Sequence, residues 1–234
     1  MADNRKNYPK SLGIVMDGNR RWARARGLPV LKGHEAGYEK LKEFVRWCKE
    51  FGIGTVYAYA FSTENWNRPK EEVGYLMKLL STVLKTESND LLKEKVRIKF
   101  VGQIEKFSPA IRFGIKKIEK ATEKLTGLTL IICLSYGGRA EIISAIKKLV
   151  HERGGRGAAK ITGDEFQKHL WTAGFPDPEL IIRTSGEIRT SNFLPWQAAY
   201  SEWFFTKTLW PALSRREFEK ILRDFAKRDI RRGR

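Results

Sequence analysis

The chain of 234 residues carries 45 Lys and Arg against 27 Asp and Glu, which gives a formal net charge of +18 at pH 7. Hydrophobic residues make up 41% and aromatic residues 12%, enough for a real core, so a disordered basic tail is excluded. The longest stretch without a charged residue, 125–138, is too short to span a bilayer as a helix, and the excess of cations indicates an anionic partner.

Apolar runs and amphipathic stretches alternate along the chain. Apolar and β-branched runs predict strands at 12–16, 55–61, 96–101, 128–134, 180–182 and 203–205. Apolar residues at three- and four-residue steps predict helices at 34–51, 73–84, 111–125, 140–150 and 218–225, with a further short helix capped by Thr162. This alternation predicts one α/β domain over 1–234, with flexible ends at 1–8 and 231–234, in which helices flank a central and mostly parallel sheet.

Unusual polar residues follow three of the predicted strands, at 17–22, 62–68 and 183–191. Ligands of parallel sheets collect at the carboxyl ends of the strands, so we expect these three loops to share one site. The loop at 62–68 is ambiguous on its own, because Trp66 suits a core and Asn65 suits a turn as well as catalysis.

The first of these loops reads Asp17-Gly-Asn-Arg-Arg-Trp22. Exposed N–H groups at a strand-to-helix junction and the forks of two arginines favour a phosphate group. One carboxylate among these cations makes sense where a divalent metal bridges it to phosphates. The same residues also fit a turn in which Asp17 caps a helix and the two arginines are solvated.

Four further residues are candidates for the same site or for structural roles. Arg183 and Arg189, with serines and a glycine between them, form a second candidate anion site directly after a buried strand. His34, at the predicted start of a helix, is either a cap or a phosphate ligand. Glu202 lies in the apolar run 198–205 and needs a partner there, which is either an arginine or a metal.

Several motifs of other catalytic sites are absent from the sequence. It contains no G-x-x-x-x-G-K-[ST], no G-x-G-x-x-G after a strand, no H-E-x-x-H and no G-x-S-x-G. It contains no D-D-x-x-D either, which argues against the helical synthases that hold diphosphates through aspartate-rich motifs. Cys48 and Cys133 form no C-x-x-C, so neither a disulfide framework nor a zinc ribbon is supported.

Taken together, the motifs resemble those of the cis-prenyltransferases, a family whose best-known member is undecaprenyl diphosphate synthase. The matching segments cover nearly the whole chain in the family's order, at 16–23, 33–34, 59–69, 137–140, 182–192 and 200–205. Near the end, Arg231-Arg-Gly233 resembles the family's R-x-G motif, which reaches across a dimer toward isopentenyl diphosphate.

The resemblance implies a homodimer with a hydrophobic tunnel above the sheet, and a Mg2+-dependent reaction. That reaction joins isopentenyl diphosphate to an allylic diphosphate of the farnesyl or geranylgeranyl type and gives a medium or long Z-polyprenyl diphosphate. Asp17 and Glu202 would hold the metal, and Asn65 would assist proton removal. The allylic diphosphate would contact Gly18, Asn19, Arg20, Arg21, His34 and Arg68, and isopentenyl diphosphate would contact Arg183, Arg189 and Ser191. Further substrate contacts are expected at Ser62, Thr63, Glu64 and Thr190, and Trp22 and Trp66 would shape the pocket between the substrates.

Two positions depart from many bacterial members of the family. Val30 replaces an arginine, whose contact Lys32, Arg24 or Arg26 would supply, and Arg20 replaces a glycine. The predicted helix at 73–84 and the strand that ends at Ala60 are expected to form tunnel walls. No insertion lengthens the region 73–95, which favours a product of medium or moderate length.

Three alternatives stand beside chain elongation: a non-catalytic partner subunit of the same fold, a nucleic-acid-binding protein, and the coupling of two allylic diphosphates. The presence of Asp17, Asn65 and Glu202 counts against the first. Basic residues dispersed among strand-end loops count against the second, so no nucleic-acid partner is expected. The isopentenyl site around Arg183 counts against the third. We expect a cytoplasmic protein that contacts the membrane transiently through its lipid product.

Overall fold

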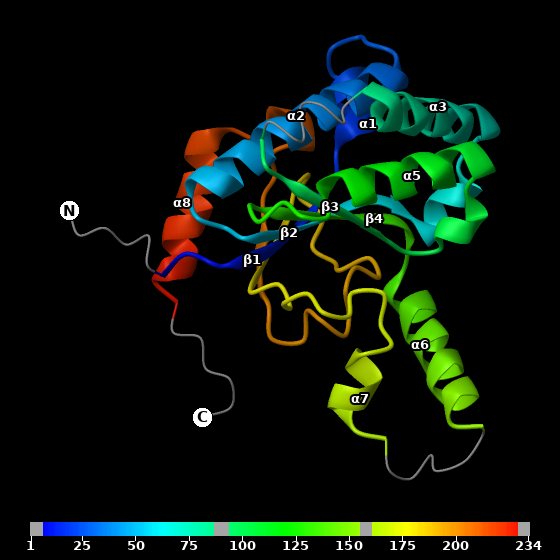
Figure 1. Ribbon diagram of the computed structural model, residues 1–234. Coiled ribbons are helices and arrows are strands. Elements are labelled where there is room, and N and C mark those ends of the chain that lie inside the picture. The colour runs from blue at the N-terminus through cyan, green and yellow to red at the C-terminus, as the bar shows by residue number, and fades with distance from the viewer. Residues whose placement is uncertain (1–6, 87–93, 155–160, 229–234) are drawn as a thin grey trace.

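Six parallel strands form one sheet at the centre of the fold (Figure 1). Across the sheet they are β3 (Arg97–Val101), β4 (Thr129–Tyr136), β2 (Thr55–Ser62), β1 (Ser11–Val15), β5 (Leu180–Arg183) and β6 (Glu202–Phe205). The structure is a computed structural model that describes residues 7–86, 94–154 and 161–228. Each predicted strand lies within two residues of the observed one, and the predicted parallel α/β fold is confirmed.

The register of the central strands brings the three polar loops together. β1 lies between β2 and β5, with Leu12 opposite Val56 on one side and Leu180 on the other. Every residue of β1 and of β5 is buried, as expected of parallel strands covered on both faces. Because the strands are parallel, the loops that follow β2, β1 and β5 leave the sheet at the same edge.

Helices cover the upper face of the sheet in Figure 1. They are α1 (Asn19–Arg24), α2 (Val30–Glu50), α3 (Lys70–Thr86) and α5 (Pro109–Thr122), with α8 (Arg215–Ala226) beside α2. Phe44 of α2 fixes α8 in place, since its ring lies 4.7 Å from that of Phe218 and 5.4 Å from that of Trp210 between centroids. Among the described residues, no helix has both the length and the apolar composition that crossing a bilayer requires.

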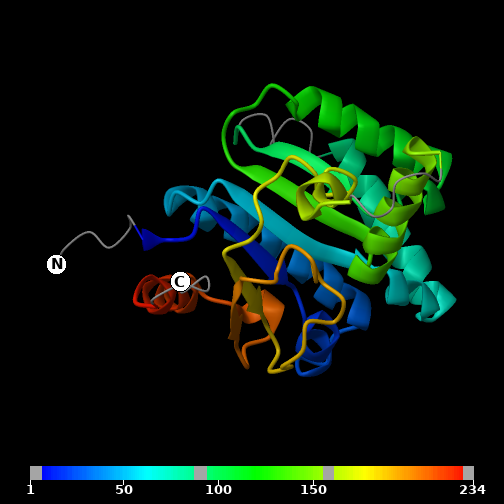
Figure 2. The ribbon, with the colours of Figure 1, turned by 90° about the horizontal axis from the view of Figure 1, so that it is seen from below.

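The opposite face is covered by the start of α6 (Gly138–Glu152), by the turns at 168–179 after α7 (Gly163–Gln167), and by the irregular segment 184–201, which Figure 2 shows from below. Phe193 and Leu194 of this segment are fully buried against the sheet. Glu141 is also fully buried, where it accepts hydrogen bonds from Tyr136, Thr172 and Gln197 and so ties α6 to the irregular segment. Of the ends expected to be flexible, 1–6 and 231–234 lie outside the described residues, whereas Tyr8 packs on Phe51.

Candidate functional site

A cavity of about 780 Å³ opens at the carboxyl edge of the sheet. All three predicted loops contribute to its wall, as expected from the strand order β2-β1-β5. The predicted site residues that line it are Asp17, Gly18, Asn19, Arg20, Arg21, His34, Ser62, Glu64, Asn65, Arg68, Arg183 and Ser191.

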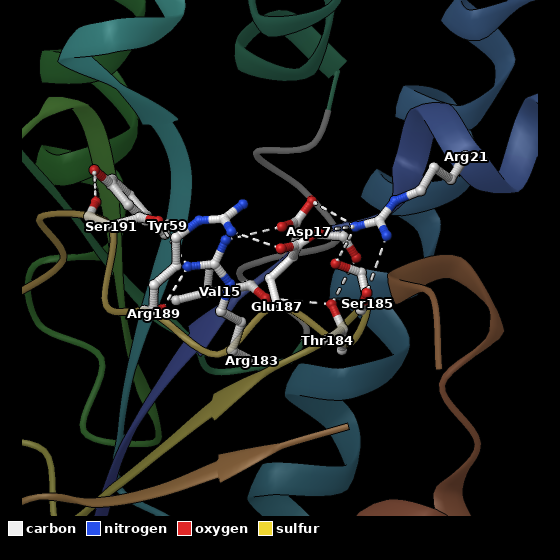
Figure 3. Close-up of polar contacts among 10 residues, drawn as sticks. All are labelled: Val15, Asp17, Arg21, Tyr59, Arg183, Thr184, Ser185, Glu187, Arg189 and Ser191. Atoms are coloured by element: carbon white, nitrogen blue, oxygen red, sulfur yellow. Dashed lines mark hydrogen bonds and ion pairs between the residues drawn. The ribbon is translucent and has the colours of Figure 1, made fainter. Parts of the chain in front are cut away.

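Asp17 lies between two guanidinium groups at the end of β1 (Figure 3). Its Oδ2 accepts a hydrogen bond from Nη2 of Arg183 at 3.0 Å, and its Oδ1 lies 3.8 Å from Nη2 of Arg21. The alternative in which Asp17 caps a helix is wrong, because Gly18 is the N-cap residue of α1 and no side chain caps that helix. Gly18 has a φ of 109°, which glycine adopts without strain, and this turn leaves the Asp17 carboxylate facing the cavity.

Arg183 connects the loop at 183–191 to Asp17. It is only 3% exposed, and its Nη1 donates to the carbonyl oxygen of Arg189 at 2.5 Å and to Oγ of Ser191 at 2.7 Å. Its buried Nε has no hydrogen-bond partner in the described ranges. Thr184 supports the same junction, since its hydroxyl donates to the Asp17 carbonyl oxygen at 2.7 Å.

The outer part of this loop contacts α1. Arg21 donates to the Ser185 carbonyl oxygen at 3.1 Å and to its Oγ at 2.6 Å. Glu187 bridges two cations, with its carboxylate 3.4 Å from Arg21 and 2.6 Å from Arg189. The side chains of Arg189 and Thr190 do not line the cavity. The loop therefore presents Arg183 and Ser191 to the cavity and uses Arg189 in an exposed ion pair at its rim.

A second cationic group lies on the helical side of the cavity, around the buried carboxylate of Glu72 in α3. Glu72 accepts from Nη1 of Arg68 at 3.1 Å, lies 3.2 Å from Nε2 of His34, and lies 3.7 Å from Nη1 of Arg20. Burial lowers the pKa of His34 below its ordinary value of 6.5, although the hydrogen bond with Glu72 acts in the opposite direction. Burial also lowers the pKa of Arg68.

His34 lies one turn inside α2, not at its start. The helix expected at 34–51 begins four residues earlier, at Val30, because Pro29 in extended conformation precedes it. The alternative that makes His34 a helix cap is therefore wrong, whereas its side chain does reach the cavity.

Two glycines of α2 allow α1 to lie directly against that helix. A Cβ atom on Gly33 would lie 2.1 Å from the Asn19 carbonyl oxygen, and one on Gly37 would lie 2.4 Å from Asn19 Oδ1. This Oδ1 is buried and has no partner in the part of the chain that the structure describes. The glycines thus set the depth at which Asn19, Arg20 and Arg21 stand in the cavity.

Asn65 takes part in a capping box at the end of β2. Its Oδ1 accepts from the Ser62 backbone N–H at 3.0 Å, while the Ser62 side chain accepts from the Asn65 backbone N–H in the short helix Thr63–Asn67. Because Oδ1 is used in the cap, the amide N–H₂ group of Asn65 is left to contact a ligand. The expected role of Asn65 in proton removal stays a prediction.

Several predicted site residues lie outside the cavity wall. Trp66 donates to Oγ of Ser135 at 2.9 Å and packs on Phe61 and Phe107, so it supports the loop from behind. Trp22 lies under the guanidinium of Arg26, 4.2 Å from the ring centroid. Thr63 lies against Gly137, on which a Cβ atom would come 2.6 Å from the Thr63 hydroxyl.

Glu202 is the first residue of β6, level with Leu180, whereas Arg183 ends β5 beside Asp17. At about 3.3 Å per residue, Glu202 therefore lies roughly 10 Å along the strands from the edge that carries Asp17. Its carboxylate pairs with Arg228, whose guanidinium also stacks on Phe204 at 4.2 Å. Of the two partners expected for Glu202, the structure supplies the arginine.

One of the three expected replacements for the arginine absent at 30 lines the cavity, and so does one residue to which the sequence assigned no role. Arg24 lines the cavity, whereas Lys32 pairs with Glu35, so Arg24 is the nearest replacement for the arginine absent at 30. Asn192 also lines the cavity and joins two loops, because it donates to Glu64 at 3.2 Å and accepts from the Arg139 backbone N–H at 2.9 Å. The pair of glycines at 137–138 was the signal in the sequence for this close approach, since a Cβ atom on Gly137 would lie 2.7 Å from Nδ2 of Asn192.

Two apolar chambers of about 150 and 270 Å³, referred to below as the apolar channel, lie next to the cavity between α2 and α3. Met16, Ala60 and Leu76 belong to the walls of both the cationic cavity and the first chamber. Leu41 and Leu80 belong to both chambers, and the second ends against β3, β4 and α5. The expected tunnel walls, Ala60 and the helix at 73–84, thus lie along this channel.

A cationic cavity beside apolar chambers suits molecules with an anionic head and a long apolar tail. Residues 15–233 match the family model described as "Putative undecaprenyl diphosphate synthase". An isoprenyl transferase of Thermus thermophilus is 46% identical over 97% of this chain and 89% of its own length. An isoprenyl transferase of Thermotoga maritima is 43% identical over 96% of this chain and 97% of its own length.

Two solved structures have the same fold. Lavandulyl diphosphate synthase from Lavandula x intermedia, in complex with dimethylallyl diphosphate, superposes with a TM-score of 0.92 at 29% identity, over 98% of this chain and all of that one. A "probable undecaprenyl diphosphate synthase" from Campylobacter jejuni superposes with a TM-score of 0.81 at 31% identity, over 97% of this chain and 99% of that one. The chain belongs to the undecaprenyl diphosphate synthase family of prenyltransferases, whose reaction is cis-prenyl chain elongation.

Proposed function

We propose that this chain, as one catalytic domain, condenses isopentenyl diphosphate with an allylic diphosphate of the farnesyl or geranylgeranyl type and gives a medium or long Z-polyprenyl diphosphate. The observation that carries the proposal is that the cationic cavity and the first apolar chamber share Met16, Ala60 and Leu76 as wall residues. The diphosphate head suits the cavity, and the prenyl chain suits the channel. Each isoprene unit that enters the channel adds roughly 4 kcal/mol of apolar burial.

The allylic diphosphate would occupy the side of the cavity that α1, α2 and the start of α3 form. The residues proposed for it are Gly18, Asn19, Arg20, Arg21, His34 and Arg68, to which we add Arg24 because it lines the cavity. The residues proposed for isopentenyl diphosphate are Arg183, Arg189, Thr190 and Ser191, with Ser62, Thr63 and Glu64 on the facing loop. Arg189 would have to leave its ion pair with Glu187 to reach the ligand.

Asp17 fits the metal that this proposal includes. Mg2+ is usually held by one or two carboxylates together with substrate phosphates, and Asp17 is a partly exposed carboxylate in a cavity rich in cations. Within 7–86, 94–154 and 161–228, no three or more His, Cys, Asp and Glu side chains form a metal site by themselves, which agrees with phosphate oxygens completing the ligand set. When bound, Mg2+ would neutralise charge on the leaving diphosphate. The assignment of Glu202 to the metal stays a prediction.

In the proposed reaction the allylic carbon–oxygen bond breaks, a carbon–carbon bond forms, isopentenyl diphosphate loses a proton, and diphosphate is released. Arg20, Arg21 and Arg68 would stabilise the charge that develops on the leaving group. Met16, Ala60 and Leu76 would keep water from the allylic carbon as it becomes cationic. Asn65 would assist loss of the proton, with Ser62 beside it.

We also propose that the chain acts as a homodimer and that it touches the membrane through its product. Exposed apolar side chains at Ile143, Ile146 and Tyr200, on α6 and the irregular segment, support a contact with a second copy. The motif at 231–233, which would reach the partner's site, lies outside the described residues. Light scattering of the purified protein tests the first proposal, and sedimentation with vesicles in the presence and absence of substrates tests the second.

The deciding experiment incubates the purified protein with Mg2+, labelled isopentenyl diphosphate and primers of several lengths, and then sizes the products by chromatography. Prenyl diphosphates that grow in five-carbon steps support the proposal. A product formed from allylic diphosphate alone would favour the coupling of two allylic groups instead. Absence of any prenyl product, together with DNA binding that weakens steeply with salt, would favour the nucleic-acid alternative.

Asp17→Ala tests the metal assignment in the same assay. The variant should lose turnover while it stays folded. Glu50→Ala is the matched control, since it also breaks a carboxylate–arginine pair, with Arg215 at 2.7 Å, but on the outside of α2. Activity that persists in Asp17→Ala would remove Asp17 from the mechanism.

A further inference from the structure

Glu72 is a buried carboxylate with three cationic or titratable neighbours from three different elements. Arg20 comes from α1, His34 from α2, and Arg68 from the end of the short helix Thr63–Asn67, two residues before α3. Glu72 itself is 7% exposed and does not line the cavity, whereas all three of its neighbours do. It therefore stands behind the cationic wall and not in it.

We propose that Glu72 is a positioning residue, which holds Arg20, His34 and Arg68 at the spacing that a diphosphate group requires. The inference rests on the proposed function only for the identity of the ligand. Arginine and histidine side chains that face a solvent-filled cavity sample several rotamers, and ordering them costs free energy when a ligand binds. Glu72 would order these side chains before the ligand arrives.

The hydrogen bonds show how one carboxylate can arrange three groups. Oε1 of Glu72 accepts from Nη1 of Arg68 and lies within hydrogen-bond distance of Nε2 of His34, while Oε2 faces Nη1 of Arg20. Each contact uses one polar atom of the neighbour. Among the described residues, the remaining N–H groups of the two guanidinium groups have no further carboxylate partner, so they can bind a ligand in the cavity.

The bond between Glu72 and His34 also fixes the orientation of the imidazole ring. In the neutral ring, Nε2–H donates to Glu72 and Nδ1 carries a lone pair. The neutral ring thus has no second N–H for a phosphate oxygen, and a diphosphate contact at Nδ1 would require His34 to take up a proton. Glu72 would then stabilise the imidazolium, and Arg20 and Arg68 would oppose it.

A neighbouring contact between the same helices supplies a matched control. Glu35 of α2 accepts hydrogen bonds from the hydroxyl of Tyr75 in α3 and from Nζ of Lys32 at 2.7 Å. Like Glu72, it is a carboxylate that joins α2 to α3, but it contacts none of the cations that line the cavity. If Glu72 did no more than link the two helices, Glu35→Gln and Glu72→Gln should weaken the binding of diphosphate equally.

Positioning and net charge predict opposite effects of Glu72→Gln. The substitution removes a negative charge behind the cavity, so attraction alone would make diphosphate bind more tightly. If Glu72 orders the cations, diphosphate should bind less tightly, by about tenfold or more, as is typical when an outer hydrogen-bond partner is lost. The sign of the change separates the two explanations.

The experiment measures the binding of inorganic diphosphate by calorimetry to the full chain and to Glu72→Gln, Glu72→Asp and Glu35→Gln, with unfolding curves for each. We expect weaker binding in Glu72→Gln, a smaller loss in Glu72→Asp, which keeps the charge but shortens the reach, and no loss in Glu35→Gln. In turnover, Glu72→Gln should raise KM for the allylic diphosphate and leave KM for isopentenyl diphosphate unchanged.

Two results would overturn the inference: unchanged or tighter diphosphate binding in Glu72→Gln, or an equal loss in Glu35→Gln. Should Glu72→Gln fail to fold, Glu72→Asp decides alone, and unchanged binding in that variant counts against positioning. A wild-type protein that binds diphosphate but makes no prenyl product would refute the proposed function and leave the binding test of Glu72 intact.

Discussion

Replacement of Gly33 by alanine tests the contact that places α1 in the cavity. The new Cβ would lie 2.1 Å from the Asn19 carbonyl oxygen, whereas carbon–oxygen contacts need about 3.3 Å. Because the obstacle is backbone, α1 must move away from α2 by roughly 1.2 Å. Overpacking of this kind costs about 1–3 kcal/mol, against a gain of about 1 kcal/mol in helix propensity. Arg20 moves with α1, and a displacement near 1 Å can lower kcat/KM by about 100-fold.

Gly74→Ala is the matched control, because Gly74 lies inside α3 with no atom within 4 Å of its Cβ position. Helix propensity alone predicts that both variants are stabilised. We expect Gly74→Ala to gain about 1 kcal/mol and keep its activity, and Gly33→Ala to lose stability together with kcat/KM. Urea denaturation and steady-state kinetics measure both quantities. A Gly33→Ala protein that is as active and as stable as Gly74→Ala would show that α1 does not rest on α2 as described.

Three further predictions follow from the channel, His34 and Glu202. Ala60→Leu should shorten the products, because Ala60 lies where the cavity meets the first apolar chamber, and an unchanged product distribution on chromatography would remove Ala60 from the wall. His34 has a lowered pKa, so the unfolded chain binds more protons than the folded one below pH 6.5. The free energy of unfolding should therefore fall as the pH is lowered from 6.5 toward the pKa of His34 in the folded protein, by up to about 1.4 kcal/mol per pH unit. His34→Asn should lack this component in urea curves at pH 7.5 and 5.5, and parallel losses in the two proteins would contradict the direction of the shift. Glu202→Gln separates the two partners that the sequence offered for Glu202: a rise of about tenfold in the Mg2+ concentration for half-maximal activity would support the predicted metal role, and an unchanged concentration would leave Glu202 as the partner of Arg228 alone.

The strands and the convergence of the three loops could be predicted because both depend on local pattern. β1 and β5 are short apolar runs, and a parallel sheet gathers the residues that follow such runs at one edge. The start of α2, which the sequence placed at His34, lies at Val30, so Gly33 is inside the helix. In the structure it serves the contact with Asn19, which nothing near it in the chain reveals.

The parts that could not be predicted depend on residues far apart in sequence. Glu72 is four residues after Arg68, so spacing alone suggests an ordinary pair on a helix surface. Its partners Arg20 and His34 come from other elements, and only the fold makes it a buried centre. The partner of Glu202 was left open between an arginine and a metal, because Arg228 is brought to it by the packing of α8.

The contact between Asp17 and Arg183 has a consequence for how ligands cooperate. Each of these two side chains serves as the other's counterion, so their contact occupies an N–H group of Arg183 and a carboxylate oxygen of Asp17. A cation that engages the Asp17 carboxylate would release an N–H group of Arg183 for an incoming phosphate oxygen. By thermodynamic linkage, the factor by which the cation raises the affinity for diphosphate equals the factor by which diphosphate raises the affinity for the cation.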